Sequence, residues 1–335
     1  MNTQKVSSND FVISPRRAPV WDGLNEQDRT LLERAAQETL TGGGDREDTL
    51  EELLRHKAAI AAVPEGHLWV EQPREAFGPP TGAVNWETGE EATADEALAM
   101  NSIGSVPNTH NLVSYLQDPR FETDRFMDAY YTSPVFLKHA GRTVTQATFG
   151  EDDGNYPQVE DAVNQLTTPE AFIKGARAKS GLFTTPVPFD SNAFISDVPM
   201  SAVDRPGGLL VQPYVHMRYE YRIFVVNHEL VTGAGCVEHH TPLDCRDLFD
   251  PAMEEHRGDG IVVDAPQVLN QHLRFADEFV KDWQDEHHEH GMYVLDVALN
   301  EKDETVAIEL NALPNAGLYA SDVYALFRAW VVSLL

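Results

Sequence analysis

The carboxy-terminal half of the chain alternates between apolar strands and amphipathic helices in a regular order. A nearly continuous apolar run is typical of a buried strand, and strict alternation of apolar and polar residues is typical of paired strands. The short turn Asn227-His228 predicts a hairpin between two such strands. The predicted elements are strands at Leu209–Val215, Glu220–Val226, Glu229–Val237, Met292–Leu299 and Thr305–Leu310, and helices at Pro266–Glu286 and Asp322–Leu335.

The middle of the chain has shorter patterns. The apolar segment Ser133–Lys138 is predicted to be a strand, and a stretch rich in Gly and Thr follows it. Thr168–Ser180 is predicted to be a helix, because Pro169 suits a first helical turn. Two further helices are predicted at Thr109–Gln117 and Arg120–Tyr131.

Residues 1–105 have weaker periodicity and no recognisable motif. Apolar residues at helical spacing predict helices at Asn25–Leu40, Asp48–Ala62 and Thr93–Met100, with a short strand at His67–Glu71. We therefore expect an α+β protein of three parts. These are a partly helical amino-terminal domain (1–105) that binds substrate or a partner, a small central subdomain (106–215) and a carboxy-terminal subdomain (216–335).

Composition and charge exclude several classes of protein. The apolar content of 42% is ordinary for a folded domain, and no apolar run is long enough to cross a bilayer. The amino terminus lacks the apolar core of a secretory signal, so we expect a cytoplasmic protein without membrane contact. A net charge of -29 disfavours binding to nucleic acid, and adaptation to the host explains it best. A site for ATP would need its own cations against this field.

The candidate chemistry lies in the second strand pair. Glu309 and Asn311 are two residues apart on a strand, so they project to the same face. If the hairpin closes through the four-residue loop Glu301–Glu304, Asp296 lies directly across from Glu309. Asp296 interrupts an apolar strand, where a lone buried charge would be costly, and this disfavours a simple solvated position. Two carboxylates and an amide oxygen suit Mg²⁺ with a nucleotide and do not suit Zn²⁺.

The run Tyr293–Asp322 resembles the carboxy-terminal signature of the ATP-grasp superfamily. Asp296, Glu309 and Asn311 match its Mg²⁺-ligand positions. The ending Asn311, Gly317, Leu318, Tyr319, Asp322 is most similar to a phage- and bacteria-associated ATP-grasp clade. The similarity covers roughly residues 130–335. It implies an ATP-grasp fold, in which two α+β subdomains enclose ATP, with an additional amino-terminal domain.

The same resemblance implies roles for residues around the first strand pair. Gln212, Tyr214 and Val215 are similar to the hinge that holds adenine, and Glu220 to the acid that binds the ribose hydroxyls. Arg222 shares a face with Glu220, and its planar fork of donors could hold the γ-phosphate or the acyl phosphate. Without the family context, an ion pair with an acid on a neighbouring strand is the better interpretation of Arg222.

Lys138 resembles the lysine that neutralises the α- and β-phosphates. The stretch Gly141–Gly154 resembles the loop that closes over the nucleotide. Members of the clade often have Arg at the position of Lys138, so this lysine departs from their pattern. Arg142 and Lys174 are both candidates for a second phosphate contact, and the sequence does not choose between them.

Other features have plainer interpretations. The histidines of Asp285–His290 are interpreted as a solvated turn, and Cys236 as a small residue of a buried strand. The two cysteines do not form a metal-binding pair. No Walker A, G-x-G-x-x-G or G-x-S-x-G sequence is present, which disfavours P-loop, Rossmann and hydrolase classes.

The resemblance implies a carboxylate–amine ligase that uses ATP and Mg²⁺ and proceeds through an acyl phosphate. Its substrates would be a small-molecule or peptide carboxylate and an amine. Two alternatives remain open, namely a small-molecule kinase with the same fold, and a nucleotide-binding scaffold without turnover. A homodimer is one option for its assembly.

Overall fold

The computed structural model describes the whole carboxy-terminal half of the molecule and parts of the rest. The described residues are 51, 54, 58, 62, 69–71, 83–85, 91–92, 103–104, 130–147, 157–175, 182–190, 208–313 and 316–334. The predicted helices Asn25–Leu40, Thr93–Met100 and Thr109–Gln117, and residues 120–129 of the helix predicted at Arg120–Tyr131, lie outside them. None of the described helices combines the length and the apolar composition that crossing a bilayer requires.

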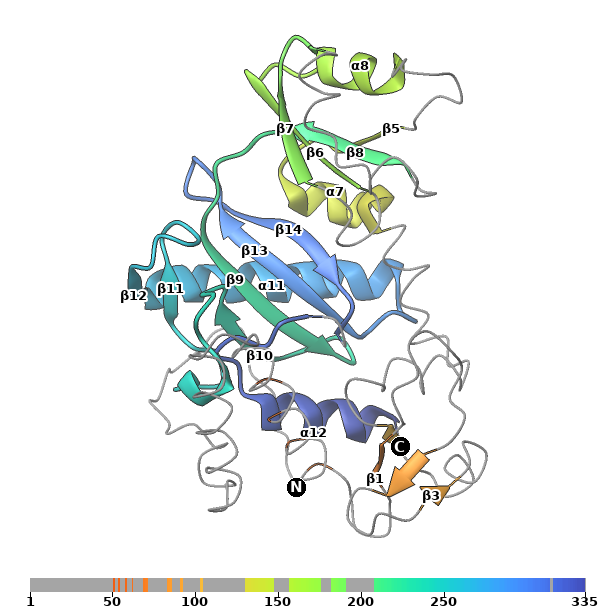
Figure 1. The fold of residues 1–335 in the computed structure, drawn as a ribbon, viewed down its shortest axis with the longest axis vertical. Coiled ribbons are helices and arrows are strands. Elements are labelled where there is room, and N and C mark those ends of the chain that lie inside the picture. The colour runs from red at the N-terminus through yellow and green to blue at the C-terminus, as the bar shows by residue number, and fades with distance from the viewer. Residues whose placement is uncertain are drawn as a thin grey trace.

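An antiparallel sheet of four strands forms the centre of the molecule (Figure 1). Its order is β10-β9-β13-β14, and its strands are β9 (Arg218–Val226), β10 (Glu229–Gly235), β13 (Tyr293–Leu299) and β14 (Thr305–Asn311). Asn227 and His228 join β9 to β10 with φ of 53° and 57°, the left-handed pair that a tight hairpin turn needs. Both predicted hairpins are therefore confirmed.

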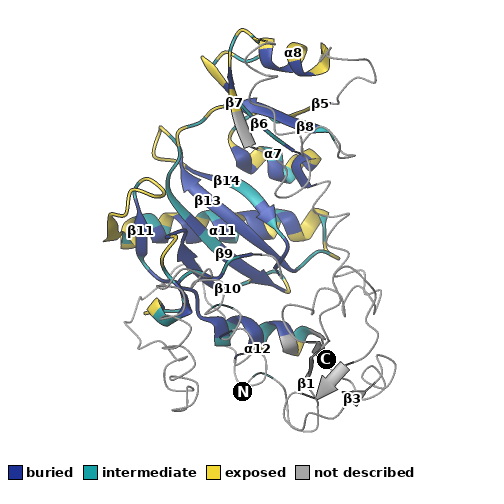
Figure 2. Cartoon of the chain, in the orientation of Figure 1, coloured by how far each residue is buried: buried dark blue, intermediate teal, exposed yellow. Residues whose placement is uncertain are grey.

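Two helices cover opposite faces of this sheet. Helix α11 (Pro266–Glu286) has the predicted bounds and packs on the face to which Tyr221, Ile223 and Leu295 point. Helix α12 (Val323–Leu334) confirms the predicted closing helix and covers part of the other face, where Phe224 and Val294 point. β9 and β13 are buried along almost their whole length, as Figure 2 shows. The part of this second face that α12 leaves open carries the polar residues described below.

His272 anchors α11 to the sheet as a neutral imidazole. Its Nε2–H donates to the carbonyl of Tyr219 at 2.9 Å, so Nδ1 is left to accept from the Thr305 hydroxyl at 3.0 Å. Burial lowers the pKa of His272 to about 4, although the Tyr219 carbonyl favours the charged form.

Acidification is therefore expected to destabilise the fold through His272. The unfolded chain binds a proton at this residue near pH 6.5 and the fold only near pH 4. The stability that depends on the neutral ring is complete above pH 6.5 and declines as the pH falls toward 4, by about 3 kcal/mol in total. Urea unfolding between pH 7 and 4 should show this decline in the wild type and a smaller one in His272→Gln. Parallel curves for the two proteins would contradict the assignment.

A second, smaller sheet has the order β5-β8-β6-β7 and lies above the first in Figure 1. Its strands are β5 (Thr145–Ala147), β6 (Glu170–Gly175), β7 (Leu182–Pro186) and β8 (Leu209–Pro213), and helix α8 (Pro157–Asn164) packs on it. The predicted strand at Leu209 is confirmed, but the predicted helix at Thr168–Ser180 is wrong. Ala171, Ile173 and Gly175 are buried in alternation along β6, which is the period of a strand.

The strand predicted at Ser133–Lys138 is also wrong, because this segment is helix α7 (Pro134–Ala140), which follows a short 3₁₀ turn at Tyr130–Thr132. Ser133 caps it by accepting from the Phe136 amide at 3.5 Å, and Pro134 occupies the first turn. Gly141 ends it in the left-handed conformation, with φ of 63°. The capping residue, the proline and the glycine are all visible in the sequence, so these end signals should have outweighed the apolar run.

Several smaller elements complete the described structure. Residues 51, 54, 58 and 62 are helical, which confirms the helix predicted at Asp48–Ala62 where it is described. β1 (Trp69–Glu71) falls within the predicted strand at His67–Glu71 and joins β2 (Ala83–Asn85), β3 (Glu91–Ala92) and β4 (Ile103–Gly104) in a sheet. A ribbon of β11 (Ala252–Glu254) and β12 (Val262–Asp264) follows a short 3₁₀ turn at Pro242–Asp244. The division into three domains stays a prediction.

Candidate active site

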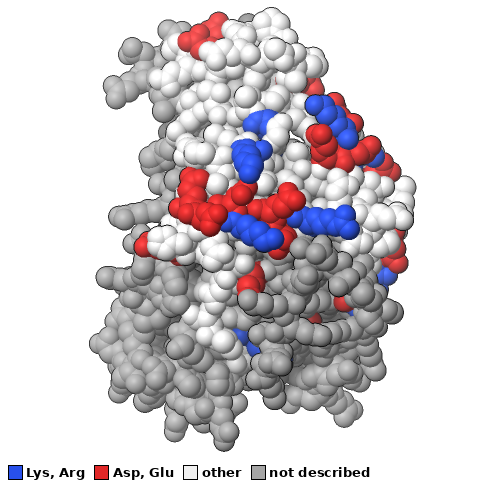
Figure 3. Space-filling model, turned by 180° about the vertical axis from the view of Figure 1, so that it is seen from behind, with Lys and Arg blue, Asp and Glu red and all other residues white. Residues whose placement is uncertain are grey.

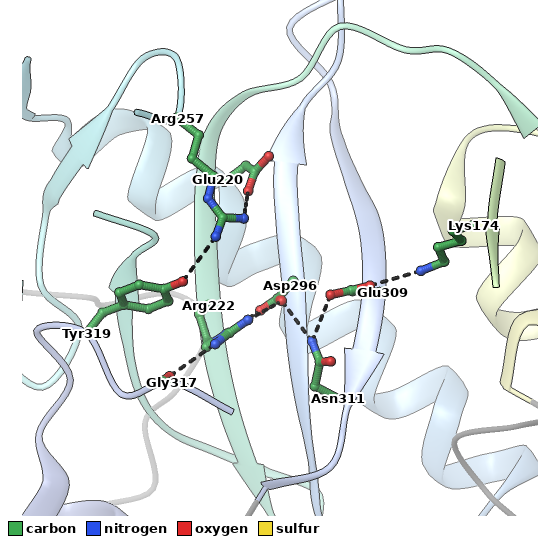
Figure 4. Close-up of polar contacts among 9 residues, drawn as sticks. All are labelled: Lys174, Glu220, Arg222, Arg257, Asp296, Glu309, Asn311, Gly317 and Tyr319. Atoms are coloured by element: carbon green, nitrogen blue, oxygen red, sulfur yellow. Dashed lines mark hydrogen bonds and ion pairs between the residues drawn. The ribbon is translucent and has the colours of Figure 1, made fainter. Parts of the chain in front are cut away.

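Three charged side chains form a row across three neighbouring strands of the large sheet. Asp296 on β13 is opposite Arg222 on β9 and also opposite Glu309 on β14. The predicted pairing of Asp296 with Glu309 is therefore confirmed. The bulge after Asp296 leaves Ile308 as an extra residue, so the loop between the strands differs from the one assumed. Figure 4 shows the row on the face of the sheet that lies opposite α11.

Arg222 holds Asp296 through two parallel hydrogen bonds. Its Nε donates to Oδ1 at 2.8 Å and its Nη2 to Oδ2 at 2.7 Å. The exposed fractions of the two side chains are only 11% and 7%. Burial raises the pKa of Asp296, and the Arg222 guanidinium acts in the opposite direction. The ion pair expected for Arg222 outside the family context is thus present, but within a buried cluster.

Asn311 and Lys174 extend the row to the other end. The Asn311 amide donates to Asp296 Oδ2 at 2.9 Å and to Glu309 Oε1 at 3.1 Å. Lys174 Nζ donates to Glu309 Oε2 at 2.9 Å. Burial alone would raise the pKa of Glu309, but Lys174 and Asn311 outweigh it and hold that pKa below its usual value. Glu309 is consequently ionised at neutral pH.

Lys174 brings the small sheet to this cluster. It lies near the end of β6, is 16% exposed, and also hydrogen-bonds the hydroxyl of Tyr130. Its pKa is raised, because Tyr130 and Glu309 more than offset the effect of burial. The sequence signal for Lys174 was its place at the end of the alternating segment 170–175. That signal was missed because the segment was interpreted as a helix.

Arg142, the other candidate for a phosphate contact, is engaged with the protein. It donates from Nε to the Gln212 side chain at 2.7 Å and from its two Nη atoms to the carbonyls of Ala140, Ala307 and Ile308 at 2.8–2.9 Å. Burial lowers its pKa to about 10. Arg142 therefore links β8 of the small sheet to β14 of the large sheet.

Glu220 lies two residues before Arg222 on β9 and pairs with an arginine that sequence analysis did not single out. Arg257 donates to Glu220 at 3.2 Å and to the Tyr319 hydroxyl at 3.4 Å. Burial raises the pKa of Glu220 despite Arg257, and raises that of Tyr319 to about 12. The Arg222 guanidinium lies over the Tyr319 ring, 5.1 Å from its centre. Arg257 comes from a loop with no regular pattern, so nothing in the sequence marked it.

The predicted hinge residues lie where the chain passes from the small sheet to the large one. Gln212 is buried near the end of β8, and its side-chain oxygen is bound by Arg142. The Tyr214 amide donates to the Glu170 carbonyl at 3.0 Å, while the Tyr214 side chain is 43% exposed. Val215 follows in the segment that connects β8 to β9 and is partly exposed. These three residues therefore lie between the two sheets, as predicted.

Lys138 does not join the row. Its predicted place at a strand end is wrong, because it lies on α7 and donates to Asp282 of α11 at 2.6 Å. A surface pocket of about 480 Å³ beside it is lined by three carboxylates, those of Asp282, Asp285 and Glu286. Acidic and basic side chains gather at the level of α11 on this rear side of the molecule (Figure 3). Such a pocket has the wrong charge for a triphosphate.

The predicted loop Gly141–Gly154 and the features set aside in the sequence have the following places. Thr145–Ala147 form strand β5, and residues 148–154 lie outside the described part of the chain. Cys236 is 4% exposed at the end of β10, and burial raises its pKa, so it is no activated thiol. Within the described ranges, no three His, Cys, Asp or Glu side chains form a metal-binding group.

The donor atoms in the row fit Mg²⁺ better than a transition metal. Asp296 and Glu309 supply carboxylate oxygens, and a flip of the Asn311 amide would present its oxygen in place of its nitrogen. Two carboxylates and one amide leave coordination positions for water and phosphate oxygens, as Mg²⁺ requires. The residues present therefore fit the metal that the sequence resemblance implied.

The chain is similar to known proteins in its family and in its fold. A family model described as an ATP-grasp domain, family 2 of its clade, matches residues 139–329, more than half of the chain. This match confirms the ATP-grasp fold predicted from the carboxy-terminal segment. It begins one residue after Lys138. No curated protein matches the chain.

Solved structures with a similar arrangement are distant in sequence. The D-alanine-D-alanine ligase from Coxiella burnetii has 15% identity and a TM-score of 0.40, over 72% of this chain and 64% of that one. D-alanyl-alanine synthetase A from Vibrio cholerae has 12% identity and a TM-score of 0.47, over 84% and 88%. N5-carboxyaminoimidazole synthase from Aspergillus clavatus, in complex with ADP, has 13% identity and a TM-score of 0.42, over 69% and 59%. The chain thus spans less than two thirds of the length of the first and third of these proteins.

Proposed function

Because the chain belongs to the ATP-grasp domains, as a member of family 2 of its clade, we propose that it is a ligase that uses MgATP to join a carboxylate to an amine. In this proposal the carboxylate is activated as an acyl phosphate, and the amine displaces the phosphate to form an amide. The substrates are a small-molecule or peptide carboxylate and a small-molecule or peptide amine. ATP and Mg²⁺ are the cofactors.

The observation that carries the proposal is the alternation of charge along one row of side chains. Arg222, Asp296, Glu309 and Lys174 follow one another, and each is joined to the next by an ion pair or by the bridging Asn311 amide. Phosphoryl transfer needs few covalent functions from the protein. It needs positioned positive charge and a divalent cation close to the phosphates. A row of buried cations and metal-binding oxygens provides both.

Each end of the row has its own task. Mg²⁺ held by Asp296, Glu309 and Asn311 would bridge phosphate oxygens and offset the charge that develops during transfer. Lys174 would place its ammonium on phosphate oxygens from the side of the small sheet, in the role first assigned to Lys138. Arg222 would offer its planar fork to the γ-phosphate or the acyl phosphate. Because the work is positional and electrostatic, no nucleophilic Ser or Cys is required.

The segment between the two sheets would hold the nucleoside. Gln212, Tyr214 and Val215 lie where the chain crosses between the sheets, and adenine would bind the backbone there. Glu220 is on the same strand face as Arg222, and its carboxylate would accept from the ribose hydroxyls. Since Glu220 is paired with Arg257 in this structure, nucleotide binding would rearrange that ion pair.

Two alternatives make different products. A kinase with this fold would release ADP and leave a stable phosphoester, whereas a ligase releases both ADP and inorganic phosphate. A scaffold that only binds nucleotide would release neither. The buried, fully charged row disfavours the scaffold, because a binding protein without turnover has little need for a costly buried cluster of charges.

A screen for substrate-dependent ADP release tests the proposal. Pools of amino acids, peptides and polyamines would be supplied with MgATP, and products identified by mass spectrometry. In the active pool we expect ADP, phosphate and a product with the mass of an amide. Lys174→Ala should raise the KM for ATP by roughly tenfold or more, because a buried charge-assisted contact is lost. Lys138→Ala is the matched control and should leave the KM unchanged.

The same measurement separates the outcomes. A phosphorylated substrate without phosphate release would favour the kinase. Binding of ATP with no ADP release in any pool would favour the scaffold. A larger effect of Lys138→Ala than of Lys174→Ala would contradict the assignment of the phosphate-binding lysine.

A further inference from the structure

A glutamate from the amino-terminal part of the chain contacts the backbone next to the active site. Oε1 of Glu51 accepts a hydrogen bond from the Leu318 amide at 2.8 Å and another from the Tyr319 amide at 3.1 Å. These residues are 267 and 268 positions away in the sequence. Two successive amides that converge on one oxygen form a small anion-binding turn, and Tyr319 has the positive φ of 46° that such a turn often contains.

The turn held by Glu51 also holds Arg222. The carbonyl of Gly317 accepts from Arg222 Nη1 at 3.1 Å, and the Tyr319 ring lies beneath the Arg222 guanidinium. Arg222 therefore has two kinds of partner. Asp296 binds one edge of its fork, and residues 317–319 bind the other edge and the flat face. A shift of this turn would change the direction of the guanidinium.

Glu51 is held in place by the helix that carries it. Leu54 and Ala58 of the same helix are completely buried, in one core cluster with Leu318 and with Phe327 of α12. The spacing of Glu51, Leu54, Ala58 and Ala62 places all four on one face of a helix. The contact with the turn is thus part of a packed interface between this helix and the carboxy-terminal region.

We propose that Glu51 is a positioning residue of the active site, and that the helix around it completes the site by fixing the turn 317–319 under Arg222. The inference rests on the proposed function, because it assigns to Glu51 the orientation of a side chain that acts on the phosphoryl group. Glu51 itself touches no reacting atom. Its ionised carboxylate is the acceptor that two amide donors favour, and charge-assisted hydrogen bonds of this kind are the stronger ones.

Three variants separate positioning from general stability. Glu51→Ala removes both hydrogen bonds, whereas Glu51→Gln keeps an oxygen that can accept them. Leu54→Ala leaves Glu51 in place and creates a cavity in the same helix interface, so it reports on stability alone. Kinetics would be measured as ADP release from MgATP in the active pool of the substrate screen. Amide hydrogen exchange of the peptide that contains residues 316–322 would be followed by mass spectrometry.

We expect Glu51→Ala to lower kcat by about tenfold to a hundredfold with little change in the KM for ATP, because small misplacements of a catalytic group have effects of this size. Its amides at 318 and 319 should exchange faster, while those of β13 should be unchanged. Glu51→Gln should recover most of the kcat. Leu54→Ala should lower the melting temperature and leave kcat within about twofold of the wild type, because Glu51 and its hydrogen bonds are retained.

Two results would overturn the inference. One is a wild-type kcat in Glu51→Ala, and the other is a Glu51→Gln variant as slow as Glu51→Ala. Failure of the proposed function has a different signature, in which the wild type itself shows no ADP release in any pool. The exchange measurement needs no turnover, so unchanged exchange at residues 318 and 319 in Glu51→Ala would overturn the positioning contact by itself.

Discussion

Replacement of Glu309 by Gln is expected to lower the rate of ADP release by at least about a hundredfold while the protein remains folded. Gln has the size of Glu and can still contact Asn311, but it removes the negative charge that binds the cation and pairs with Lys174. The Mg²⁺ concentration for half-maximal rate should rise at the same time. Both quantities are measured by titrating Mg²⁺ in an ADP-release assay at saturating ATP.

Glu304→Gln is a matched control for this variant. Glu304 lies in the loop between β13 and β14, is exposed, and contacts only its neighbour Asn300 among the hydrogen bonds described for its side chain. The same change of charge at this position should leave the rate and the Mg²⁺ dependence unaltered. Wild-type turnover in Glu309→Gln would show that the metal site has been assigned to the wrong residues.

The catalytic strand pair could be predicted from the sequence because its pattern has few alternatives. Asp296 is a single charge within an apolar strand, and Glu309 and Asn311 are two apart on the next strand. A hairpin with a short loop leaves few possible registers, so the pairing of Asp296 with Glu309 followed from local geometry. The helix Pro266–Glu286 was predicted with its observed bounds because its apolar residues keep helical spacing over 21 residues.

The errors arose where two patterns of similar strength compete in a short segment. Segment 133–140 is apolar like a strand, but its capping serine, proline and terminal glycine make it a helix. Segment 170–175 alternates like a strand, but Pro169 before it suggested a helix start. The second error had a functional consequence. It hid the position of Lys174 at a strand end and left Lys138 as the apparent phosphate ligand.

Contacts between distant parts of the chain could not be predicted at all. Arg257 meets Glu220 and Tyr319 only through the path of a loop, and Glu51 reaches Leu318 from the amino-terminal helix. Neither arginine nor glutamate is unusual in its local sequence. Their proximity is a property of how the helices and the sheet pack together, which a single sequence without homologues does not reveal.

Replacement of Arg222 by Met is expected to reduce the free energy of unfolding by about 3–5 kcal/mol at neutral pH. It would leave Asp296 buried, with the Asn311 amide as its remaining hydrogen-bond donor among the contacts described. The pKa of Asp296, which burial already raises, would rise further without the guanidinium. Urea unfolding of the wild type and of Arg222→Met at several pH values measures the loss.

The pH dependence of that loss has a definite sign. In Arg222→Met the folded protein holds a proton on Asp296 up to a higher pH than the unfolded chain does. The destabilisation should therefore shrink as the pH falls toward the ordinary Asp pKa of about 3.9 and grow as the pH rises through the folded value. A loss that is the same at pH 5 and pH 8 would mean that Asp296 is not the group left without a partner.

The double variant Arg222→Met, Asp296→Leu separates the fold from the chemistry. Buried ion pairs that are replaced as a whole by apolar side chains are often as stable as the original, whereas loss of one partner is costly. We therefore expect the double variant to recover most of the free energy of unfolding and to show no ADP release. Recovery of stability without activity would mean that the pair is retained for catalysis, since an apolar pair would serve the fold equally well. If the double variant is as unstable as Arg222→Met, the row contributes to folding in a way that its charges alone do not explain.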